Sequence, residues 1–179
     1  GRALSAQGKL DDAIAEYRQA ILLSPETRPA RFNLGNDLLR KGDWAEAATA
    51  YLEALRLNPG DAKAHYGLGL ALYGERDDAG AVAEYRRSLA LDPGAGEVHL
   101  ALGLALVAEN NVAGAIREYR TTLEMDPRDA VAHADLASAL VKKGNGKEAL
   151  KELRAAMALA PGDMRYHASY DELVKEVTH

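Results

Sequence analysis

The sequence contains no cysteine, and this absence removes several kinds of site at once. Disulfide frameworks, zinc sites built on thiolates and thiol nucleophiles are all excluded. An excess of positive charge is missing too, because 22 Lys and Arg stand against 27 Asp and Glu, a formal net charge of −5. Nucleic-acid binders usually carry a strongly basic face, so no nucleic-acid partner is expected. The densest basic stretch, from Lys142 to Arg154, contains Glu148 and Glu152 and is predicted to be a solvated helix face.

Long apolar runs are missing as well. The most apolar run, from Val98 to Ala108, is shorter than the about 20 residues that span a bilayer, so no direct membrane insertion is expected. No signal peptide is visible in a chain that begins at Gly1 without a methionine, which leaves open that it is a fragment of a larger protein. These observations do not identify a compartment, and the cytoplasm is only slightly favoured. With 47% hydrophobic and 27% charged residues, the 179-residue chain has a globular composition that predicts one continuous fold.

What the sequence does contain is a repeat of 34 residues. Five of the six prolines recur at this interval, and alanine, tyrosine and leucine residues recur in the same register. The columns are Pro25, Pro59, Pro93, Pro127 and Pro161; Ala13, Ala47, Ala81, Ala115 and Ala149; Tyr17, Tyr51, Tyr85, Tyr119 and then Leu153; and Leu34, Leu68, Leu102 and Leu136, each followed by Gly or Ala. So many columns in one register indicate a repeated structural unit.

Each unit is predicted to be a pair of helices. In the repeat that follows Pro25, apolar residues at helical spacing predict a first helix from Pro29 to Lys41. Gly42 interrupts it, and Asp43 is a suitable N-cap for a second helix from Trp44 to Leu57. Small residues such as Gly35 are expected to let the two helix backbones approach closely. The tyrosine column is expected to fill the core around that contact.

These columns resemble the tetratricopeptide repeat family, whose pattern runs from an aromatic through Leu-Gly, Ala and a second aromatic to Pro. The pattern stands here as Leu68-Gly69, then Ala81, Tyr85 and Pro93, with a histidine in the place of the leading aromatic. The resemblance covers essentially the whole chain. It implies an all-α fold, a right-handed superhelix of stacked antiparallel helix pairs.

The same register predicts the organisation of the chain. A partial repeat, mainly its second helix, is expected at residues 1–27. Full repeats are expected at 28–61, 62–95, 96–129 and 130–163. A C-terminal capping helix is expected at 164–179, because its Asp171 stands where the repeats carry a small residue that only a following partner helix would require.

No catalytic constellation is found, so we expect no enzyme activity, no cofactor and no metal. Neither a Gly-x-Ser-x-Gly elbow nor a His-Glu-x-x-His motif occurs. Histidines do recur every 34 residues, at His65, His99, His133 and His167, which could indicate a metal or pH-sensing ladder. A packing column is favoured instead, because these histidines replace the family's aromatic. Stacked helices lie about 8–10 Å apart, whereas metal–nitrogen bonds are about 2 Å long. Successive imidazoles would therefore be too far apart to share an ion easily.

The resemblance also places a binding surface. In this family the first helix of each pair lines a concave groove, and the outward-looking columns on those helices are not needed for the core. The predicted groove is polar at one end and apolar in the middle: Phe32, Asn33, Asn36 and Arg40, then Tyr66, Leu70, Tyr73, Leu100, Leu104 and Val107. The family's carboxylate clamp and asparagine ladder do not fit, since Asn36 alone matches the clamp. The alternative that these side chains pack against the next repeat, and so are not free to bind a partner, stays open.

We therefore expect a non-enzymatic protein-protein interaction scaffold that binds an apolar or amphipathic peptide or helix in the concave groove. One alternative is a regulatory or substrate-docking arm of a larger enzyme whose catalytic domain is absent from this chain. Another is a self-assembly module that associates through its N-terminal end.

Overall fold

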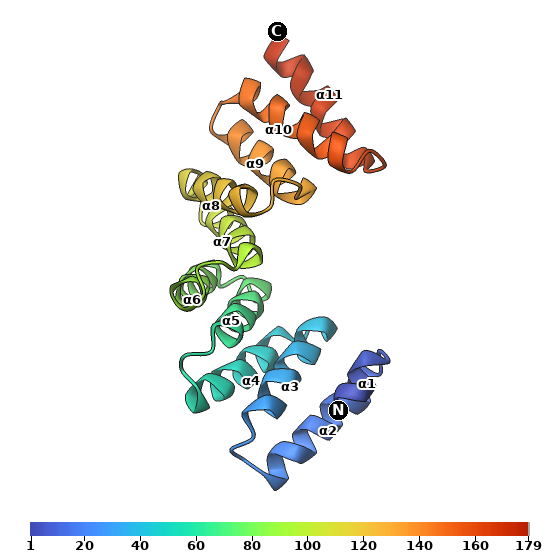
Figure 1. The fold of residues 1–179 in the computed structure, drawn as a ribbon, viewed down its shortest axis with the longest axis vertical. Coiled ribbons are helices and arrows are strands. Elements are labelled where there is room, and N and C mark those ends of the chain that lie inside the picture. Colours follow the sequence, from blue (N-terminus) through green and yellow to red (C-terminus); the bar gives the residue numbers. More distant parts are fainter. Residues whose placement is uncertain (179) are drawn as a thin grey trace. The chain divides into compact units, whose positions relative to one another are not determined.

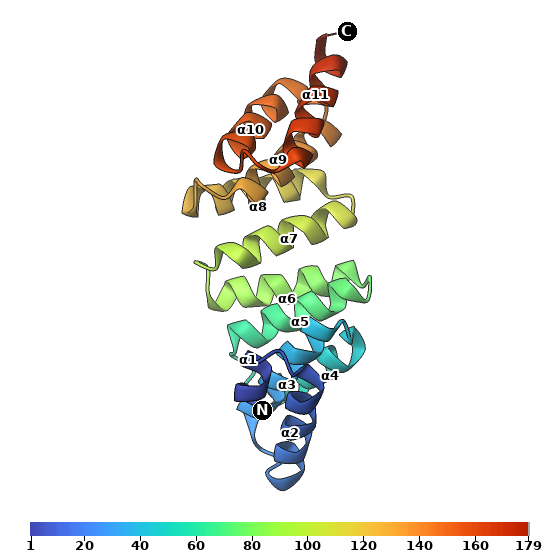
Figure 2. The same ribbon diagram turned by 90° about the vertical axis from the view of Figure 1, so that its right-hand side faces the viewer.

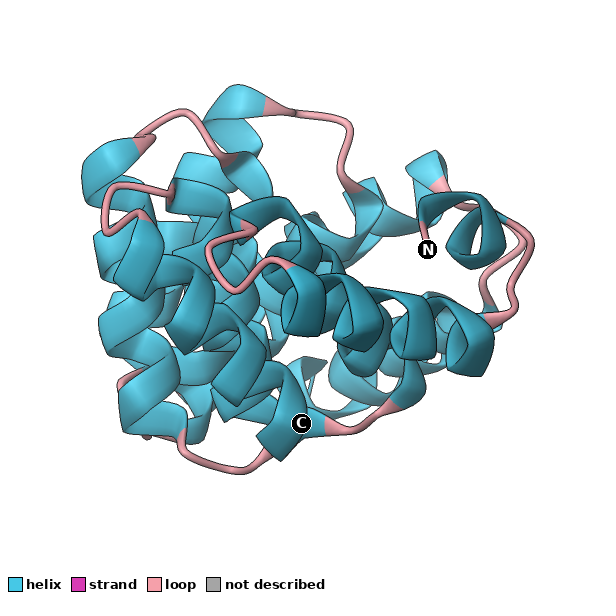
Figure 3. Cartoon of the chain, turned by 90° about the horizontal axis from the view of Figure 1, so that it is seen from below, coloured by secondary structure: helices cyan, strands magenta, loops and turns pink. Residues whose placement is uncertain are grey.

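A computed structural model describes residues 1–178, and every element in that range is a helix or a connecting loop (Figure 3). The helices are α1 (Arg2–Ala6), α2 (Leu10–Leu23), α3 (Arg28–Lys41), α4 (Trp44–Leu57), α5 (Ala62–Gly74), α6 (Asp78–Leu91), α7 (Gly96–Ala108), α8 (Val112–Met125), α9 (Ala130–Lys142), α10 (Gly146–Leu159) and α11 (Met164–Thr178) (Figure 1). The helices predicted from Pro29 to Lys41 and from Trp44 to Leu57 are confirmed as α3 and α4, within one residue at each end. None of the helices in residues 1–178 has the length and apolar character to cross a membrane.

The helices form two compact units, the first over residues 1–93 and the second from Gly94 onward. In the first unit, each helix from α1 to α6 packs against the next one along the chain. In the second unit the same holds from α7 to α11 (Figures 1 and 2). Each unit is therefore a stack of helical hairpins, which confirms the all-α class. The repeat boundaries stay a prediction, as does the cap at 164–179, whose last residue lies outside the described part of the chain.

The tyrosine column lies in the core of these hairpins. Tyr51, Tyr85 and Tyr119 are each 1% exposed or less. Each ring lies against a glycine of the preceding helix, since a Cβ added at Gly69 would stand 2.5 Å from Cε1 of Tyr85. The glycines therefore make room for a tyrosine ring, whereas the sequence had suggested a close approach of two backbones. Where Leu153 replaces the tyrosine, an alanine replaces the glycine.

Within the second unit, α11 packs against α10 at another glycine. A Cβ at Gly146 would stand 2.5 Å from Cγ2 of Val177, so glycine at the start of α10 lets α11 lie close. Tyr166 and Leu173 of α11 are buried, 8% and 5% exposed, whereas Asp171 is exposed. A helix buried on one face and polar on the other suits the end of a stack.

The turn inside each hairpin contains one residue with positive φ. These residues are Gly8 (76°), Gly42 (85°), Arg76 (68°), Asn110 (61°) and Gly144 (84°). In the α5–α6 turn, the N–H of Asp77 donates to the carbonyl of Leu72 at 2.9 Å, and the other four turns close in the same way. This left-handed helix end normally uses glycine or asparagine, because a Cβ is unfavourable there. Arg76 is the exception in the column.

Helix α1 is expected to exchange its amide hydrogens faster than the helices of the second unit. It has only 5 residues and none of them is buried, so little packing opposes its opening. In a hydrogen-exchange experiment, residues 1–9 should lose protection well before residues 97–125. Equal protection of the two segments in a proven monomer would contradict this expectation.

Candidate functional site

The first unit contains a groove of about 840 Å³ between α3 and α5, to which the first residue of α4 also contributes. Its lining consists of Asn36, Leu39 and Arg40 from α3, Trp44 from α4, Leu70, Tyr73 and Gly74 from α5, and Arg76 from the following turn. Four of the residues predicted for the binding groove, Asn36, Arg40, Leu70 and Tyr73, come together here. The walls are mainly apolar, and no acidic side chain contributes to the lining.

Asn36 is held in place by the core. The hydroxyl of Tyr51 donates to Oδ1 of Asn36 at 2.6 Å. Burial, with the Asp37 carboxylate adding to it, raises the pKa of Tyr51, so the hydroxyl stays protonated and continues to donate. With its oxygen occupied, Asn36 keeps the two N–H donors of its amide for the groove.

Arg40 has structural partners within the first unit. Its Nη1 donates to Oδ1 of Asp37 at 3.1 Å and to Oγ of Ser5 at 2.9 Å. Asp37 is only 2% exposed and also accepts from Oγ of Ser5 at 2.6 Å. Arg40 therefore neutralises a buried carboxylate and ties α1 to α3. The sequence predicted Arg40 as a groove residue, and the structure shows that its Nη1 already binds Asp37 and Ser5.

Trp44 belongs to the groove, although the sequence interpretation treated it only as the first residue of a helix. Its indole lies against the backbone of Gly74, because a Cβ added at Gly74 would stand 2.5 Å from Cδ2 of the ring. The side chain remains 39% exposed and contributes a flat apolar wall. The signal available in the sequence was that Trp44 is the single tryptophan of the chain.

Arg76 is the second residue that sequence reasoning missed. It has no hydrogen bond or ion pair from its side chain to any part of residues 1–178, and it is exposed. A non-glycine residue held in the left-handed region costs on the order of 1 kcal/mol relative to glycine. Its place in a column that is otherwise glycine and asparagine could have been read from the sequence.

The other predicted groove residues lie elsewhere. Phe32 and Asn33 line a separate hollow beside Arg28 and Lys63, and Tyr66 packs against Tyr85 with ring centroids 5.9 Å apart. Leu100, Leu104 and Val107 belong to α7 in the second unit, where Leu104 is 36% exposed and the other two are half-buried. None of the five apolar residues at the centre of the predicted groove is fully buried: Tyr66, Leu70, Tyr73, Leu100 and Leu104.

Comparison with known proteins identifies the family. The sequence matches the description "Tetratricopeptide repeat" over residues 32–96 and again over 106–173, and "TPR repeat" over residues 1–42. The chain belongs to the tetratricopeptide repeat family. A comparison with curated proteins finds no match.

Solved structures of other tetratricopeptide repeat proteins share the fold. One is MamA, with a TM-score of 0.85 and 23% identity over 92% of this chain and 96% of that one. Another is YrrB, described as a TPR protein with an unusual peptide-binding site, with a TM-score of 0.83 and 25% identity over 95% of this chain and 88% of that one. A third, TTC0263 of Thermus thermophilus, has a TM-score of 0.72 and 19% identity over 97% of this chain and 95% of that one.

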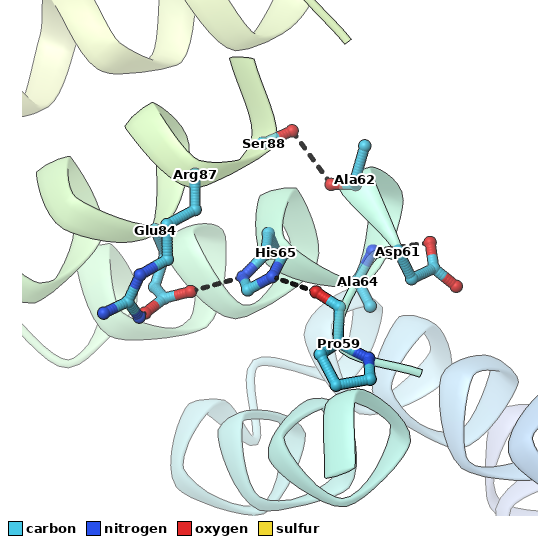
Figure 4. A network of polar contacts seen from close by, with 8 residues as sticks. All are labelled: Pro59, Asp61, Ala62, Ala64, His65, Glu84, Arg87 and Ser88. Atoms are coloured by element: carbon cyan, nitrogen blue, oxygen red, sulfur yellow. Dashed lines mark hydrogen bonds and ion pairs between the residues drawn. The ribbon is translucent and has the colours of Figure 1, made fainter. Parts of the chain in front are cut away.

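Three of the histidines that replace the family's leading aromatic each contact a glutamate of the same hairpin, and Figure 4 shows this link at His65. Nδ1 of His65 lies 2.7 Å from Oε2 of Glu84, and Nε2 lies 3.0 Å from the carbonyl oxygen of Pro59. Since a neutral imidazole has one N–H, both contacts are hydrogen bonds only when both nitrogens carry a proton. The carboxylate of Glu84 is also bound by Arg87.

The same link recurs in later repeats, as His99 with Glu118 and His133 with Glu152, each at 2.7 Å. His65, His99 and His133 thus lie half-buried within their hairpins, beside carboxylate partners that the sequence interpretation missed, whereas Nε2 of His167 in α11 lies 3.2 Å from the carbonyl oxygen of Pro161. Glu84, Glu118 and Glu152 recur every 34 residues, so the signal was present. Within residues 1–178, no group of three or more His, Cys, Asp or Glu is arranged to hold a metal ion.

Asp135 of α9 is a half-buried carboxyl whose ionisation should lower the stability of the second unit. Burial, together with the nearby Asp129 carboxylate, raises its pKa to about 6. Because the folded-state pKa exceeds the unfolded value, the folded state binds more protons between about pH 4 and 6. Stability therefore falls as the pH rises through that window.

Asp135→Asn should remove this loss. At pH 7.5 the variant should be more stable than the wild type by about 1 kcal/mol, a value reduced from the full shift because the side chain is partly solvated. Below about pH 4 the two proteins should converge, since both side chains are then neutral. Urea denaturation at pH 4, 5, 6 and 7.5 measures the difference, and a difference that does not depend on pH would contradict the assignment.

Proposed function

We propose that this tetratricopeptide repeat protein is a non-catalytic scaffold that binds an apolar or amphipathic segment of a partner protein in the groove between α3 and α5. The observation that carries the proposal is the groove itself, with its volume of about 840 Å³ and its side chains Leu39, Leu70, Tyr73 and Trp44. All four are partly exposed. A hollow of this size, mainly apolar with a few polar donors at its edge, is typical of binding sites.

The chemistry of the groove favours a peptide over a small polar ligand. Trp44 and Tyr73 offer flat aromatic surfaces of the kind that anchor protein segments in grooves. Asn36 supplies amide donors that a peptide carbonyl can accept. YrrB, which shares the fold at 25% identity, is described as having a peptide-binding site, and this agrees with the proposal.

A peptide-display selection tests the proposal. The full chain, immobilised, is screened against a random 12-residue library displayed on phage, and the recovered peptides are counter-screened on the Leu70→Ala/Tyr73→Ala variant. We expect enriched peptides with large apolar residues that bind the wild type and fail to bind the variant. The proposal is wrong if no peptide is enriched, or if the enriched peptides bind both proteins equally.

Self-association is retained as a second candidate. Leu22 and Leu23 at the end of α2 are 75% and 78% exposed, and an apolar hollow beside them is lined by Ile21, Leu34 and Leu38. Exposed apolar surface of this kind is often an interaction site. Light scattering over a dilution series should show a mass that falls towards the monomer if this surface associates. A constant monomer mass at all concentrations would exclude it.

A further inference from the structure

The lining of the groove in the first unit contains positive charge and none of the opposite sign. Arg40 and Arg76 are its only charged lining residues, although the chain as a whole carries a net charge of −5. The sequence neighbours of Arg76 do not change this, since Glu75 and Asp77 are outside the lining and Asp77 accepts the N–H of Gly80 at 3.0 Å. Within the lining itself, the formal charge is therefore entirely positive, which suits an anionic group.

We infer that the partner segment carries an Asp or Glu side chain beside the apolar side chain that enters the groove, and that Arg76 binds this carboxylate. The inference rests on the proposed peptide-binding function and specifies the chemistry of its ligand. Three features of Arg76 support it: its place in the groove lining, its lack of an internal partner, and its backbone conformation.

Arg76 is the cation of the groove that is available to a partner. Arg40 donates to Asp37 and Ser5, so moving it to a ligand would leave the buried Asp37 carboxylate without its cation. The side chain of Arg76 has no hydrogen bond or ion pair within residues 1–178. A guanidinium with free donors in a planar fork matches the two oxygens of a carboxylate.

The backbone conformation of Arg76 supports the same inference. The turn closes identically at all five positions of its column, and glycine or asparagine serves at the other four. Nothing in the folding of the turn therefore requires arginine at φ 68°. A residue held in an unfavourable conformation without a structural role is a sign of function.

The apolar walls decide between a peptide carboxylate and other anions. A nucleic acid or a polyphosphate would need several free cations, whereas this groove offers one. Trp44 and Tyr73 stand in the same lining as Arg76, so a segment that places a large apolar side chain between them brings its neighbouring residues to the guanidinium. An acidic residue within about two positions of an aromatic or aliphatic residue satisfies both requirements.

The display selection described above supplies the probe. The most enriched peptide is synthesised in its parent form and with its Asp or Glu changed to Asn or Gln, and both are titrated into wild type, Arg76→Gly and Asn110→Gly by calorimetry. Asn110→Gly is the matched control, because it introduces glycine at the equivalent left-handed position of a turn in the second unit.

We expect an acidic residue next to a large apolar residue in the enriched peptides. The parent peptide should bind Arg76→Gly about tenfold more weakly than wild type and bind Asn110→Gly unchanged. The neutral peptide should bind wild type as weakly as the parent binds Arg76→Gly, and changing both should cause no further loss. Arg76→Gly should also melt about 2–4 °C higher than wild type, so that weaker binding is not due to unfolding.

The outcomes separate the inference from the function on which it rests. If no peptide is enriched, the proposed function fails and the inference with it. If peptides bind through Leu70 and Tyr73 but lack acidic residues, or bind Arg76→Gly as tightly as wild type, the scaffold function stands and the role of Arg76 is refuted.

Discussion

Gly69→Leu is expected to destabilise the first unit by about 3 kcal/mol, at the upper end of the cost of overpacking a core. A Cβ alone would stand 2.5 Å from Cε1 of Tyr85, and that ring is 1% exposed, so neither the ring nor the leucine has space to move into. Urea denaturation followed by circular dichroism measures the loss. The matched control is Asp171→Leu, at the equivalent position of α11, where the side chain is exposed and the loss should be small.

A compensating pair tests the physical reason for the glycine. The α9–α10 hairpin carries Ala137 and Leu153 where the α5–α6 hairpin carries Gly69 and Tyr85, and both Ala137 and Leu153 are buried. Gly69→Ala and Tyr85→Leu should each destabilise alone, while the double variant should lose less than their sum by at least about 1 kcal/mol. Strict additivity would show that the glycine is not there for the ring.

Leu70→Ala combined with Tyr73→Ala is expected to weaken peptide binding by about 2 kcal/mol or more, close to thirtyfold, because buried anchors dominate binding in grooves. Both side chains line the groove and are half-buried before any partner binds, so truncation removes contact area that only the complex fully uses. Helical content should be unchanged by circular dichroism. Fluorescence anisotropy with a labelled peptide from the display selection gives the affinity.

The second unit provides the control for this experiment. Leu104→Ala with Val107→Ala changes the same two columns of the repeat in α7, outside the groove of the first unit. Its effect on affinity should be less than about threefold. An equal loss from the two double variants would contradict the assignment of binding to the first unit. Arg40 is a poor probe, because its removal leaves the buried Asp37 carboxylate without its cation and destabilises the fold.

The sequence by itself determined the family, the all-α class and the positions of α3 and α4. The 34-residue columns carry this information because every hairpin buries the same positions against its neighbours. Tyr51, Tyr85 and Tyr119 therefore had to be core residues, as their burial confirms. The resemblance to the family indicated which helices could carry a groove, and periodicity separated the residues on those helices that the core needs from those that it does not.

Only the tertiary structure decided which of those residues line the same groove. Periodicity treats every repeat alike, but a groove forms where particular side chains differ: Trp44 lies on Gly74, and Tyr51 holds Asn36. The sequence placed Arg40 in the groove without showing that Asp37 already engages it, because that link depends on the position of α1. It gave Arg76 no role, because the cost of a side chain at φ 68° becomes visible only once the turn is closed.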